Sequence, residues 1–282
     1  MNAGIPPTEL HRIIDAALRE DAALGDVTTH LVVEAGAEGL ARAVARRDLV
    51  VAGIDVFRQV FLRVDPYVAV HALAADGDRA AAGAVMARIE GPLRSILAAE
   101  RVALNLFCRM CGVATLTRRY VDAVPPGSPT RILDTRKTTP GLRALERHAV
   151  RCGGGLNHRG DLAAGILVKD NHIAACGGFT ADAVRRALRG AGPTQQVEVE
   201  VETIEQLDEA IAAGAHAVML DNMPLDKLAA AVERAAGRVL VEVSGRVRVQ
   251  DVPAIAALGV DFISVGALTH SAPAADVALD VE

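Results

Sequence analysis

From residue 131 onward, short apolar segments alternate with amphipathic segments that have helical spacing. The apolar segments are RILDT, GILVK, QVEVEVE, AVMLD, VLVEVSG and DFISVG, and the helical ones include TADAVRRALRG, TIEQLDEAIAAG, PLDKLAAAVERAAG and VQDVPAIAALG. Thr203 with Gln206 is typical of a capping box, and Gly214, Gly237 and Gly259 are typical of helix ends. A strand–helix repeat of about 20 residues predicts parallel βα units, as in a βα barrel.

Polar or small residues stand where each predicted strand ends. They are Asp134 to Lys137, Lys169 to His172, Glu200 and Glu202, Asp221 and Asn222, Ser244 and Gly245, and Gly266. Because the chemistry of a βα barrel lies at the carboxyl ends of its strands, the pattern predicts a functional site at these positions.

The part of the chain before residue 131 has a different texture. Residues 8–20 have helical periodicity, with Thr8 as the expected N-cap. Residues 39–90 contain short alternating segments split by glycine and DGD, which predict strands of a modest mixed sheet. Residues 93–124 predict a long helix or a broken pair of helices, ended by PPGSP.

Cationic side chains gather in one short region of a chain whose formal net charge is -5. They are Arg136, Lys137, His158, Arg159 and Lys169. A cleft lined by cations is costly to desolvate unless an anion occupies it. The run therefore indicates a ligand with more than one negative group, although each residue alone could be a solvated surface charge.

The segment QVEVEVE places valines on one face of a strand and Glu198, Glu200 and Glu202 on the other. We expect the valines to face outer helices and the glutamates to face the barrel interior, where the neighbouring cations or a metal would meet them. An edge strand with a wet acidic face is the alternative. Asp221 ends the next strand, and two carboxylates with a substrate phosphate are a normal arrangement for magnesium.

The last two predicted strands end in VSG and SVGALTH. Small residues there expose backbone N–H groups, and the loops after the last strands of a βα barrel commonly bind phosphate. A tight turn is the alternative for a single glycine.

Composition excludes several classes of protein. Aromatic residues make up only 2% of the 282 residues and the net charge is negative, so a nucleic-acid partner is not expected. There is no apolar run of about 20 residues for a membrane span and no signal-like N-terminus, so we expect a cytoplasmic protein. Cys108 and Cys111 form a CxxC, but it lies in a helical pattern among apolar residues and indicates packing rather than a redox or zinc site.

Nearly the whole chain resembles one family, the quinolinate phosphoribosyltransferases, also called nicotinate-nucleotide pyrophosphorylases (carboxylating). The segments that carry the resemblance are LREDAALGDVTT, SILAAERVALNLFCRMCGVATLTRRYVDAV, DTRKTTPGLR, AVRCGGGLNHRGDL, ILVKDNHI, VEVEVE, MLDN, VEVSG and VGALTHSA. The chain departs from the family pattern at Arg246, where a second small residue is common, and at Cys108 and Cys111, where polar or small residues are more usual.

The resemblance implies an N-terminal α/β sandwich with a linker helix at residues 1–112. An open or incomplete βα barrel follows at residues 113–282, with a C-terminal tail that could pack back on the first domain. It implies a homodimer with sites shared across the interface. It also implies transfer of phosphoribosyl from phosphoribosyl pyrophosphate to quinolinate with magnesium, releasing carbon dioxide and pyrophosphate and giving nicotinate mononucleotide.

The resemblance also assigns roles to residues. Quinolinate would be bound by Arg101 of the neighbouring subunit together with Arg136, His158, Arg159 and Lys169. Lys137, Asn171 and magnesium held through Glu200 and Asp221 would serve the pyrophosphate, and Ser244, Gly245, Gly266 and Ala267 the 5-phosphate. Thr135, Arg246, Val265 and His270 complete the expected substrate site, and Lys137, Glu200 and Asp221 are the expected catalytic residues.

Three other functions stay open at this point. A paralogous transferase of the same fold would use a different nitrogenous acceptor. A Schiff-base lyase would use Lys137 or Lys169, although Asp170 and a polyanion would oppose the depressed lysine pKa that such chemistry needs. A non-catalytic binding protein would explain the cations but not two carboxylates at metal spacing.

Overall fold

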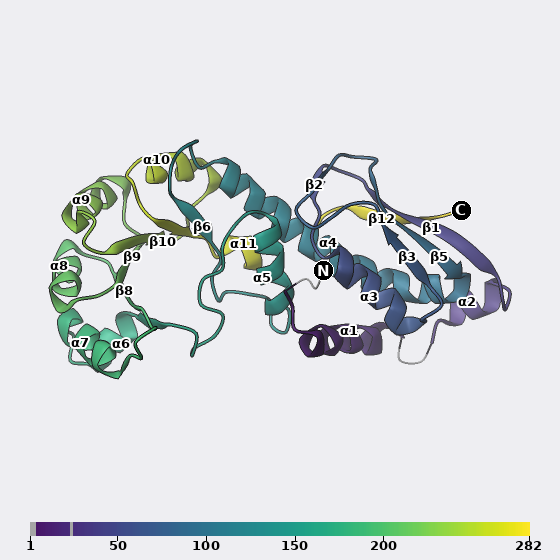
Figure 1. Ribbon diagram of the computed structural model, residues 1–282, viewed down its shortest axis with the longest axis horizontal. Coiled ribbons are helices and arrows are strands. Elements are labelled where there is room, and N and C mark those ends of the chain that lie inside the picture. Colours follow the sequence, from purple (N-terminus) through teal and green to yellow (C-terminus); the bar gives the residue numbers. More distant parts are fainter. Residues whose placement is uncertain (1–3, 23–24) are drawn as a thin grey trace. The chain divides into compact units, whose positions relative to one another are not determined.

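The computed structural model describes residues 4–22 and 25–282 (Figure 1). The chain forms two compact units. The first unit comprises Met1–Arg118, Thr138–Gly154 and Leu268–Glu282, and the second comprises Arg119–Lys137 and Gly155–Ala267. The expected division at residues 112 and 113 falls within one long helix, and it stays a prediction.

The first unit contains a four-stranded sheet with the order β12-β1-β5-β3. Its strands are β1 (Glu38–Ala45), β3 (Ala69–Ala72), β5 (Val85–Pro92) and β12 (Val277–Val281). Each neighbouring pair in this sheet is antiparallel, so the expectation of a mixed sheet is wrong. The C-terminal segment supplies β12, in which Leu279 pairs with Ala43 of β1. Two short strands, β2 (Leu49–Val50) and β4 (Arg79–Ala80), form a separate antiparallel pair.

Helices supply most of the first unit's core. They are α1 (Pro7–Ala22), α2 (Val27–Val32), α3 (Ile54–Val64), most of α4 (Leu93–Asp122) and α5 (Arg143–Cys152). The aromatic rings of Phe57 and Phe107 lie 5.1 Å apart between α3 and α4, and both are fully buried. Within the segment 93–124 a single helix, α4, spans Leu93–Asp122, and α3 interrupts the strands expected over 39–90. Thr8 lies inside α1, which begins at Pro7, so its assignment as the N-cap is wrong.

The CxxC lies inside α4, as expected. Cys111 is fully buried, and its Sγ accepts a hydrogen bond from the backbone N–H of Ala52. Cys108 is half-buried and contacts the carbonyl oxygen of Val277. Both thiols are packed against backbone, which confirms that this pair serves packing.

The second unit is built on a six-stranded parallel sheet with the order β6-β11-β10-β9-β8-β7. Its strands are β6 (Arg131–Leu133), β7 (Ile166–Val168), β8 (Val197–Val201), β9 (Ala217–Asp221), β10 (Leu240–Ser244) and β11 (Phe262–Ser264). In the described part of the chain β6 and β7 end the sheet without pairing to each other, so this is an open βα barrel. The expected fold class and all six expected strands are confirmed.

Helices cover the outer face of this curved sheet (Figure 1). They are α6 (Asp170–Ala175), α7 (Thr180–Gly190), α8 (Ile204–Ala213), α9 (Leu225–Ala235), a 3₁₀ turn (Val249–Asp251) and α10 (Val252–Ala256). A further short helix, α11 (Ala267–His270), follows β11. The capping box is confirmed, since the Thr203 hydroxyl accepts from the N–H of Gln206. Gly214 caps α8 in the left-handed conformation, whereas Ala236, not Gly237, caps α9.

No helix in residues 4–22 and 25–282 combines the length and apolar character that a bilayer crossing needs.

The packing of α4 against the C-terminal segment predicts a strict requirement at Gly112. A Cβ at this position would lie 2.0 Å from the carbonyl oxygen of Pro273, a backbone atom that cannot turn aside. We expect Gly112→Ala to destabilise the protein by about 1–3 kcal/mol or more, because overpacking forces the backbone to shift. The measurement is the urea midpoint of unfolding. Gly190→Ala is the matched control, since a Cβ there meets nothing within 4 Å; equal midpoints for both variants would contradict the prediction.

Candidate active site

A cavity of about 420 Å³ lies at the carboxyl ends of the strands of the second unit. It is lined by Thr135, Arg136, Lys137, His158, Arg159, Leu167, Lys169, Glu200, Met219, Asp221, Glu242, Ser244 and Ser264. Cations line it from three segments: Arg136 and Lys137 follow β6, His158 and Arg159 lie on the loop between α5 and β7, and Lys169 follows β7. Carboxylates line it from β8, β9 and β10. Its two charge types are therefore positioned by different strands of one rigid sheet.

Asp134 holds two of these loops together. Its carboxylate is fully buried and accepts hydrogen bonds from the side-chain amide of Asn157 at 2.5 Å and from the backbone N–H of His158 at 2.8 Å. A buried carboxylate is tolerated only where donors satisfy it, so these bonds fix the loop after β6 against the loop that carries His158. Asp134 is thus a positioning residue for the cations on both loops.

His158 sits among acidic side chains. Its Nε2 lies 3.1 Å from the Glu198 carboxylate and 3.5 Å from that of Glu242. Burial opposes the charge of His158, but the hydrogen bond to Glu198 and the charges of Glu242 and Glu198 outweigh burial and raise its pKa. The imidazole is therefore biased toward its cationic form, which suits it to face an anion.

Glu242 is the most deeply buried acid of the cavity, with 3% of its surface exposed. Burial and then the neighbouring Glu198 carboxylate raise the pKa of Glu242 to about 8, although His158 acts in the opposite direction. Its Oε1 atom is buried without a hydrogen-bond partner among the described residues. The carboxyl group is accordingly protonated at neutral pH.

Two guanidinium groups lie close to each other at the cavity. The pKa of Arg159 is lowered, by burial first and then by the charge of Arg136. Arg159 Nη1 donates to the carbonyl oxygen of Gly165, which fixes the side chain on its loop. Two neighbouring guanidinium groups repel each other until an anion lies between them.

Lys169 and Glu200 form an ion pair across β7 and β8. The Glu200 carboxylate is therefore met by a cation, as expected for an acid on the inner face of this sheet. Asp221 ends β9 and accepts a hydrogen bond from the side-chain amide of Asn222 at 2.5 Å. Glu202, in contrast, lies beyond the end of β8 and is exposed, so its expected place in the barrel interior is wrong.

A second cavity of about 280 Å³ adjoins Ser244 and is lined in part by Gly245 and Arg246. Gly245 has φ +97°, and a Cβ there would lie 2.5 Å from the side-chain oxygen of Asn222, so no other residue fits this turn. Arg246 also has a positive φ, of 52°, and its side chain is exposed. The glycine is therefore required by a tight turn that brings backbone close to the end of β9.

The structure brings together most, but not all, of the residues that the sequence singled out. Nine line the first cavity, namely Thr135, Arg136, Lys137, His158, Arg159, Lys169, Glu200, Asp221 and Ser244. Asn171 is exposed on α6, Val265 is buried, and the imidazole of His270 contacts the hydroxyl of Ser271. None of Asn171, Val265, Gly266, Ala267 and His270 is among the described residues that line either cavity. Arg101 lies on α4 in the first unit with 63% of its side chain exposed.

Sequence reasoning missed Glu242 and Ser264 as cavity residues. A signal for Glu242 exists: in VLVEVSG the glutamate alternates with Val241 and Val243, so the period-two argument that was applied to QVEVEVE places it on the inner face. Ser264, 2% exposed, follows the same alternation in DFISVG but carries no charge to draw attention to it.

At this cavity the described side chains could hold a cation in two places. Glu200 and Asp221 offer the carboxylate oxygens that magnesium prefers, although Lys169 already neutralises Glu200. His158, Glu198 and Glu242 form a tighter group, with one ligand atom from each lying within 4.8 Å of the others. The protonated Glu242 and the cation-biased His158 make the second group the poorer one for a hard divalent cation, so the donor set at Glu200 and Asp221 fits magnesium better.

Comparison with known proteins agrees with the geometry. The family model described as "Quinolinate phosphoribosyl transferase, N-terminal domain" matches residues 26–111, and the one described as "Quinolinate phosphoribosyl transferase, C-terminal domain" matches residues 113–280. The chain therefore belongs to the quinolinate phosphoribosyltransferase family.

Individual relatives are similar over nearly their whole length. The probable nicotinate-nucleotide pyrophosphorylase [carboxylating] of Bacillus subtilis (strain 168) is 41% identical, covering 97% of this chain and 93% of the relative. The nicotinate-nucleotide pyrophosphorylase [carboxylating] of Mycobacterium leprae (strain TN) is 43% identical, covering 95% of each. The solved nicotinate-nucleotide pyrophosphorylase of Francisella tularensis superposes with a TM-score of 0.93 at 39% identity, covering 99% of this chain and 98% of that one.

The raised pKa of Glu242 makes a prediction about stability and pH. In the unfolded chain this carboxyl would ionise near pH 4.5, whereas in the folded protein it keeps its proton up to about pH 8. The folded state thus binds more protons between these values, so the contribution of Glu242 to the free energy of unfolding falls as pH rises. We expect Glu242→Gln to remove a pH-dependent loss on the order of 1–3 kcal/mol between pH 5 and pH 8.

The measurement is the urea midpoint of parent and variant across this range. The exposed Glu233 on α9 provides the control variant Glu233→Gln, which should follow the parent. A parent and a Glu242→Gln variant with parallel pH profiles would show that the carboxyl is ionised in the fold.

Proposed function

We propose that this protein transfers the phosphoribosyl group of phosphoribosyl pyrophosphate to quinolinate with decarboxylation. The products are nicotinate mononucleotide, carbon dioxide and pyrophosphate, as in the de novo synthesis of NAD. The observation that carries the proposal is the cavity in which Arg136, His158, Arg159 and Lys169 gather opposite buried carboxylates. The two relatives named above, both nicotinate-nucleotide pyrophosphorylases [carboxylating] by name, support the same reaction.

A pyridine dicarboxylate matches the cations of the cavity. Arg136 and Arg159 lie close enough for the charge of one to lower the pKa of the other, so a carboxylate between them relieves repulsion. Planar guanidinium groups pair with carboxylates through two parallel hydrogen bonds. His158 and Lys169 then serve the second carboxylate, while Glu198 keeps the imidazole oriented.

The phosphate groups call for different partners. We assign the pyrophosphate to Lys137 and Asn171, with magnesium held through Glu200 and Asp221. That ion would neutralise the negative charge that develops on the departing pyrophosphate. We assign the 5-phosphate to Ser244, Gly245, Gly266 and Ala267, with Thr135, Arg246, Val265 and His270 as its neighbours. Backbone N–H groups exposed by small residues suit a phosphate in charge and geometry.

The carboxylates also serve the sugar. As the bond from the sugar to pyrophosphate breaks, positive charge builds on the ribose, and the carboxylates of Glu200 and Asp221 at the cavity wall stabilise it. Decarboxylation then needs no protein nucleophile, because the quaternary ring nitrogen stabilises the carbanion that the lost carboxylate leaves.

Other functions are less well supported. A Schiff-base lyase would need a lysine held by apolar walls, whereas Lys169 Nζ is held by the Glu200 carboxylate. A binding protein has no use for Glu242 and Glu198 beneath the anion site. A related transferase would use an acceptor with a different number of carboxylates from quinolinate. The choice of acceptor is therefore the decisive test.

The first prediction from the proposed function concerns the second carboxylate of quinolinate. We expect the protein to use quinolinate and to reject nicotinate, which lacks the carboxylate beside the ring nitrogen and would leave desolvated cations unpaired. A lost contact of this kind costs about 2–5 kcal/mol, or roughly 30-fold to several thousand-fold in kcat/KM. The measurement is an ultraviolet assay of acid consumption with phosphoribosyl pyrophosphate and magnesium.

Arg159→Ala should reduce kcat/KM for quinolinate far more than for nicotinate, because it removes the group that discriminates between them. Arg185→Ala, on the exposed face of α7, is the matched control and should leave both values unchanged. Comparable use of the two acids by the parent would overturn the quinolinate assignment and favour the paralogous transferase.

We further propose a cytoplasmic homodimer in which Arg101 of one subunit completes the cavity of the other. The exposed Arg101 guanidinium supports this, since it lies as far as 4.0 Å from the Glu100 carboxylate of its own helix.

Subunit complementation tests the shared site. Arg101→Ala and Arg136→Ala should each be inactive alone, whereas a mixture of the two should regain activity in heterodimers that carry one intact site. Mass spectrometry of differently tagged subunits verifies exchange. Verified heterodimers with no regained activity would show that Arg101 does not act across an interface.

A further inference from the structure

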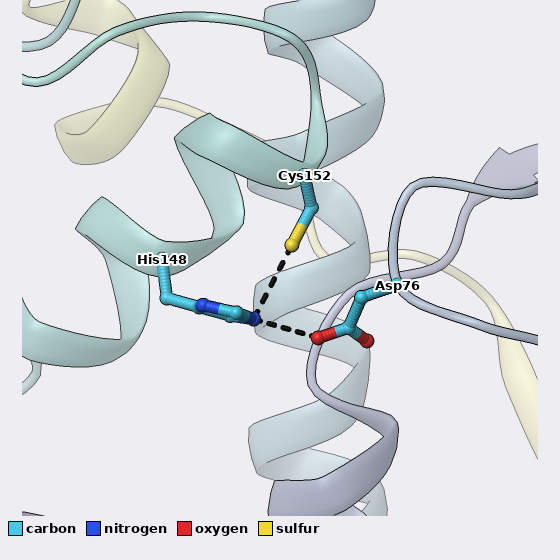
Figure 2. Close-up of side chains that lie close together, drawn as sticks. All are labelled: Asp76, His148 and Cys152. Carbon is cyan, nitrogen blue, oxygen red and sulfur yellow. Dashed lines mark hydrogen bonds and ion pairs between the residues drawn. The ribbon is translucent and has the colours of Figure 1, made fainter. Parts of the chain in front are cut away.

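Three side chains with metal-binding atoms converge in the first unit, in a cluster that the proposed reaction does not use. They are Asp76, His148 and Cys152 (Figure 2). The Oδ2 atom of Asp76 lies 2.6 Å from His148 Nε2, and the Sγ atom of Cys152 lies 3.3 Å from the same nitrogen. All three ligand atoms lie within 4.8 Å of one another.

The local structure brings these atoms together from two directions. His148 and Cys152 are four residues apart on α5, so their side chains lie on one face of the helix. Asp76 reaches them from the turn between β3 and β4, opposite that face (Figure 2). Its other oxygen, Oδ1, accepts from the backbone N–H groups of Gly53 and Ile54 at 2.7 and 3.0 Å. These bonds cap α3 and hold the carboxylate so that Oδ2 faces His148.

The arrangement differs from a catalytic relay. In a Cys–His–Asp relay the thiol contacts one ring nitrogen and the carboxylate contacts the other. Here the thiol and the carboxylate both contact Nε2, so three ligand atoms surround one point. Burial and the charge of Asp76 also raise the pKa of the Cys152 thiol to about 12, which keeps it protonated and unreactive in the absence of a cation.

We propose that Asp76, His148 and Cys152 bind one divalent cation of the zinc class. Zinc takes nitrogen, sulfur and oxygen donors in tetrahedral geometry, at about 2.0–2.3 Å. Those lengths place donor atoms about 3.3–3.6 Å apart, so the Sγ–Nε2 separation already fits and the Oδ2–Nε2 separation must open by about 0.7 Å. The Asp76 or the His148 side chain would have to rotate to supply that movement.

Proton balance follows from the donors. The thiol of Cys152 loses its proton to solvent and binds as thiolate, while Asp76 binds as the carboxylate it already is. His148 would bind through Nε2 without a proton there and would carry its proton on Nδ1. Arg151 Nη2 lies 3.4 Å from Nδ1, so this guanidinium would have to shift when Nδ1 carries the proton. The bound ion and its two anionic ligands are then neutral together.

The site would keep one coordination position for water. Three protein ligands with an open fourth position are typical of accessible zinc sites rather than closed structural ones. The Asp76 side chain, 22% exposed, borders solvent, whereas the His148 side chain is 10% exposed. Magnesium does not suit the site, because it prefers oxygen ligands only. The bound ion would join the turn at Asp76 to α5 within the first unit.

The test titrates the untagged full chain with Co²⁺ after treatment with a chelator. A cobalt–thiolate bond gives a charge-transfer absorption in the near ultraviolet, and tetrahedral cobalt gives intense visible bands. We expect both to saturate at one Co²⁺ per chain and to disappear when Zn²⁺ is added. This readout is independent of the transferase assay, so failure of one does not decide the other.

Variants separate this site from other thiols. Cys152→Ser should lose the charge-transfer band and weaken Zn²⁺ binding by at least about 100-fold. Mutation of residues that only hydrogen-bond to metal ligands already lowers metal affinity about 10–100-fold. Asp76→Asn keeps an oxygen to cap α3 but loses the charge, so it should fold and bind more weakly. Cys176→Ser, a half-buried cysteine of the second unit, is the matched control and should keep the bands.

Two results would overturn the proposal. One is a parent chain without charge-transfer absorption at one equivalent of Co²⁺. The other is a Cys152→Ser variant whose bands and Zn²⁺ affinity equal those of the parent. Thermal unfolding of each variant without metal verifies that it is folded, so that loss of binding reports on the ligands.

Discussion

The candidate site depends on the compensation of charges that face the inner side of a parallel sheet. Glu198, Glu200 and Glu242 stand on β8 and β10, where water reaches them poorly. An unpaired buried carboxylate is costly, so each needs a cation or a proton. Glu200 pairs with Lys169, Glu198 pairs with His158, and Glu242 keeps its proton. The cations thereby gain fixed positions before any anion arrives.

This compensation leaves two neighbouring guanidinium groups at the cavity. Lys169 and His158 have carboxylate partners, whereas burial and then the charge of Arg136 lower the pKa of Arg159. In the proposed reaction an anionic substrate would bind where these two positive charges lie. The acids beneath it would keep the ring of His158 oriented and supply negative charge where a ribose cation would form. The same residues would then serve both ground-state binding and stabilisation of the transition state.

Local sequence pattern predicts the second unit well and the first unit poorly. The six parallel strands and their helices follow from periodicity, because each strand is buried and each helix is amphipathic. In the first unit, β12 pairs with β1 across more than two hundred residues, and Leu279 opposite Ala43 has no local signal. The direction of strand pairing likewise depends on tertiary contacts. The mixed sheet was wrong for this reason. The cap at Thr8 was wrong for a local one, because Pro7 suits the first helical position and begins α1 one residue earlier.

For the candidate site, nine of the residues predicted from strand ends and motifs line one cavity. Glu242 was missed because a single glutamate between valines looks like an ordinary strand residue, and only its neighbours across the sheet reveal its burial. Asn171 and His270 do not line the cavity. Their predicted roles depend on a bound substrate, and the role of Arg101 depends on a second subunit; neither can be deduced from the pattern of one chain.

The two proposed cation sites differ in donor chemistry, and this difference would keep their ions apart. Glu200 and Asp221 offer only oxygen, which suits a hard cation that retains several waters and meets phosphate oxygens. Asp76, His148 and Cys152 offer oxygen, nitrogen and sulfur, which suit a borderline-soft cation. Magnesium prefers oxygen ligands only, so millimolar magnesium would not displace zinc from a site with one nitrogen and one sulfur donor. The choice of metal ion at each site would thus be set by the donor atoms of its side chains.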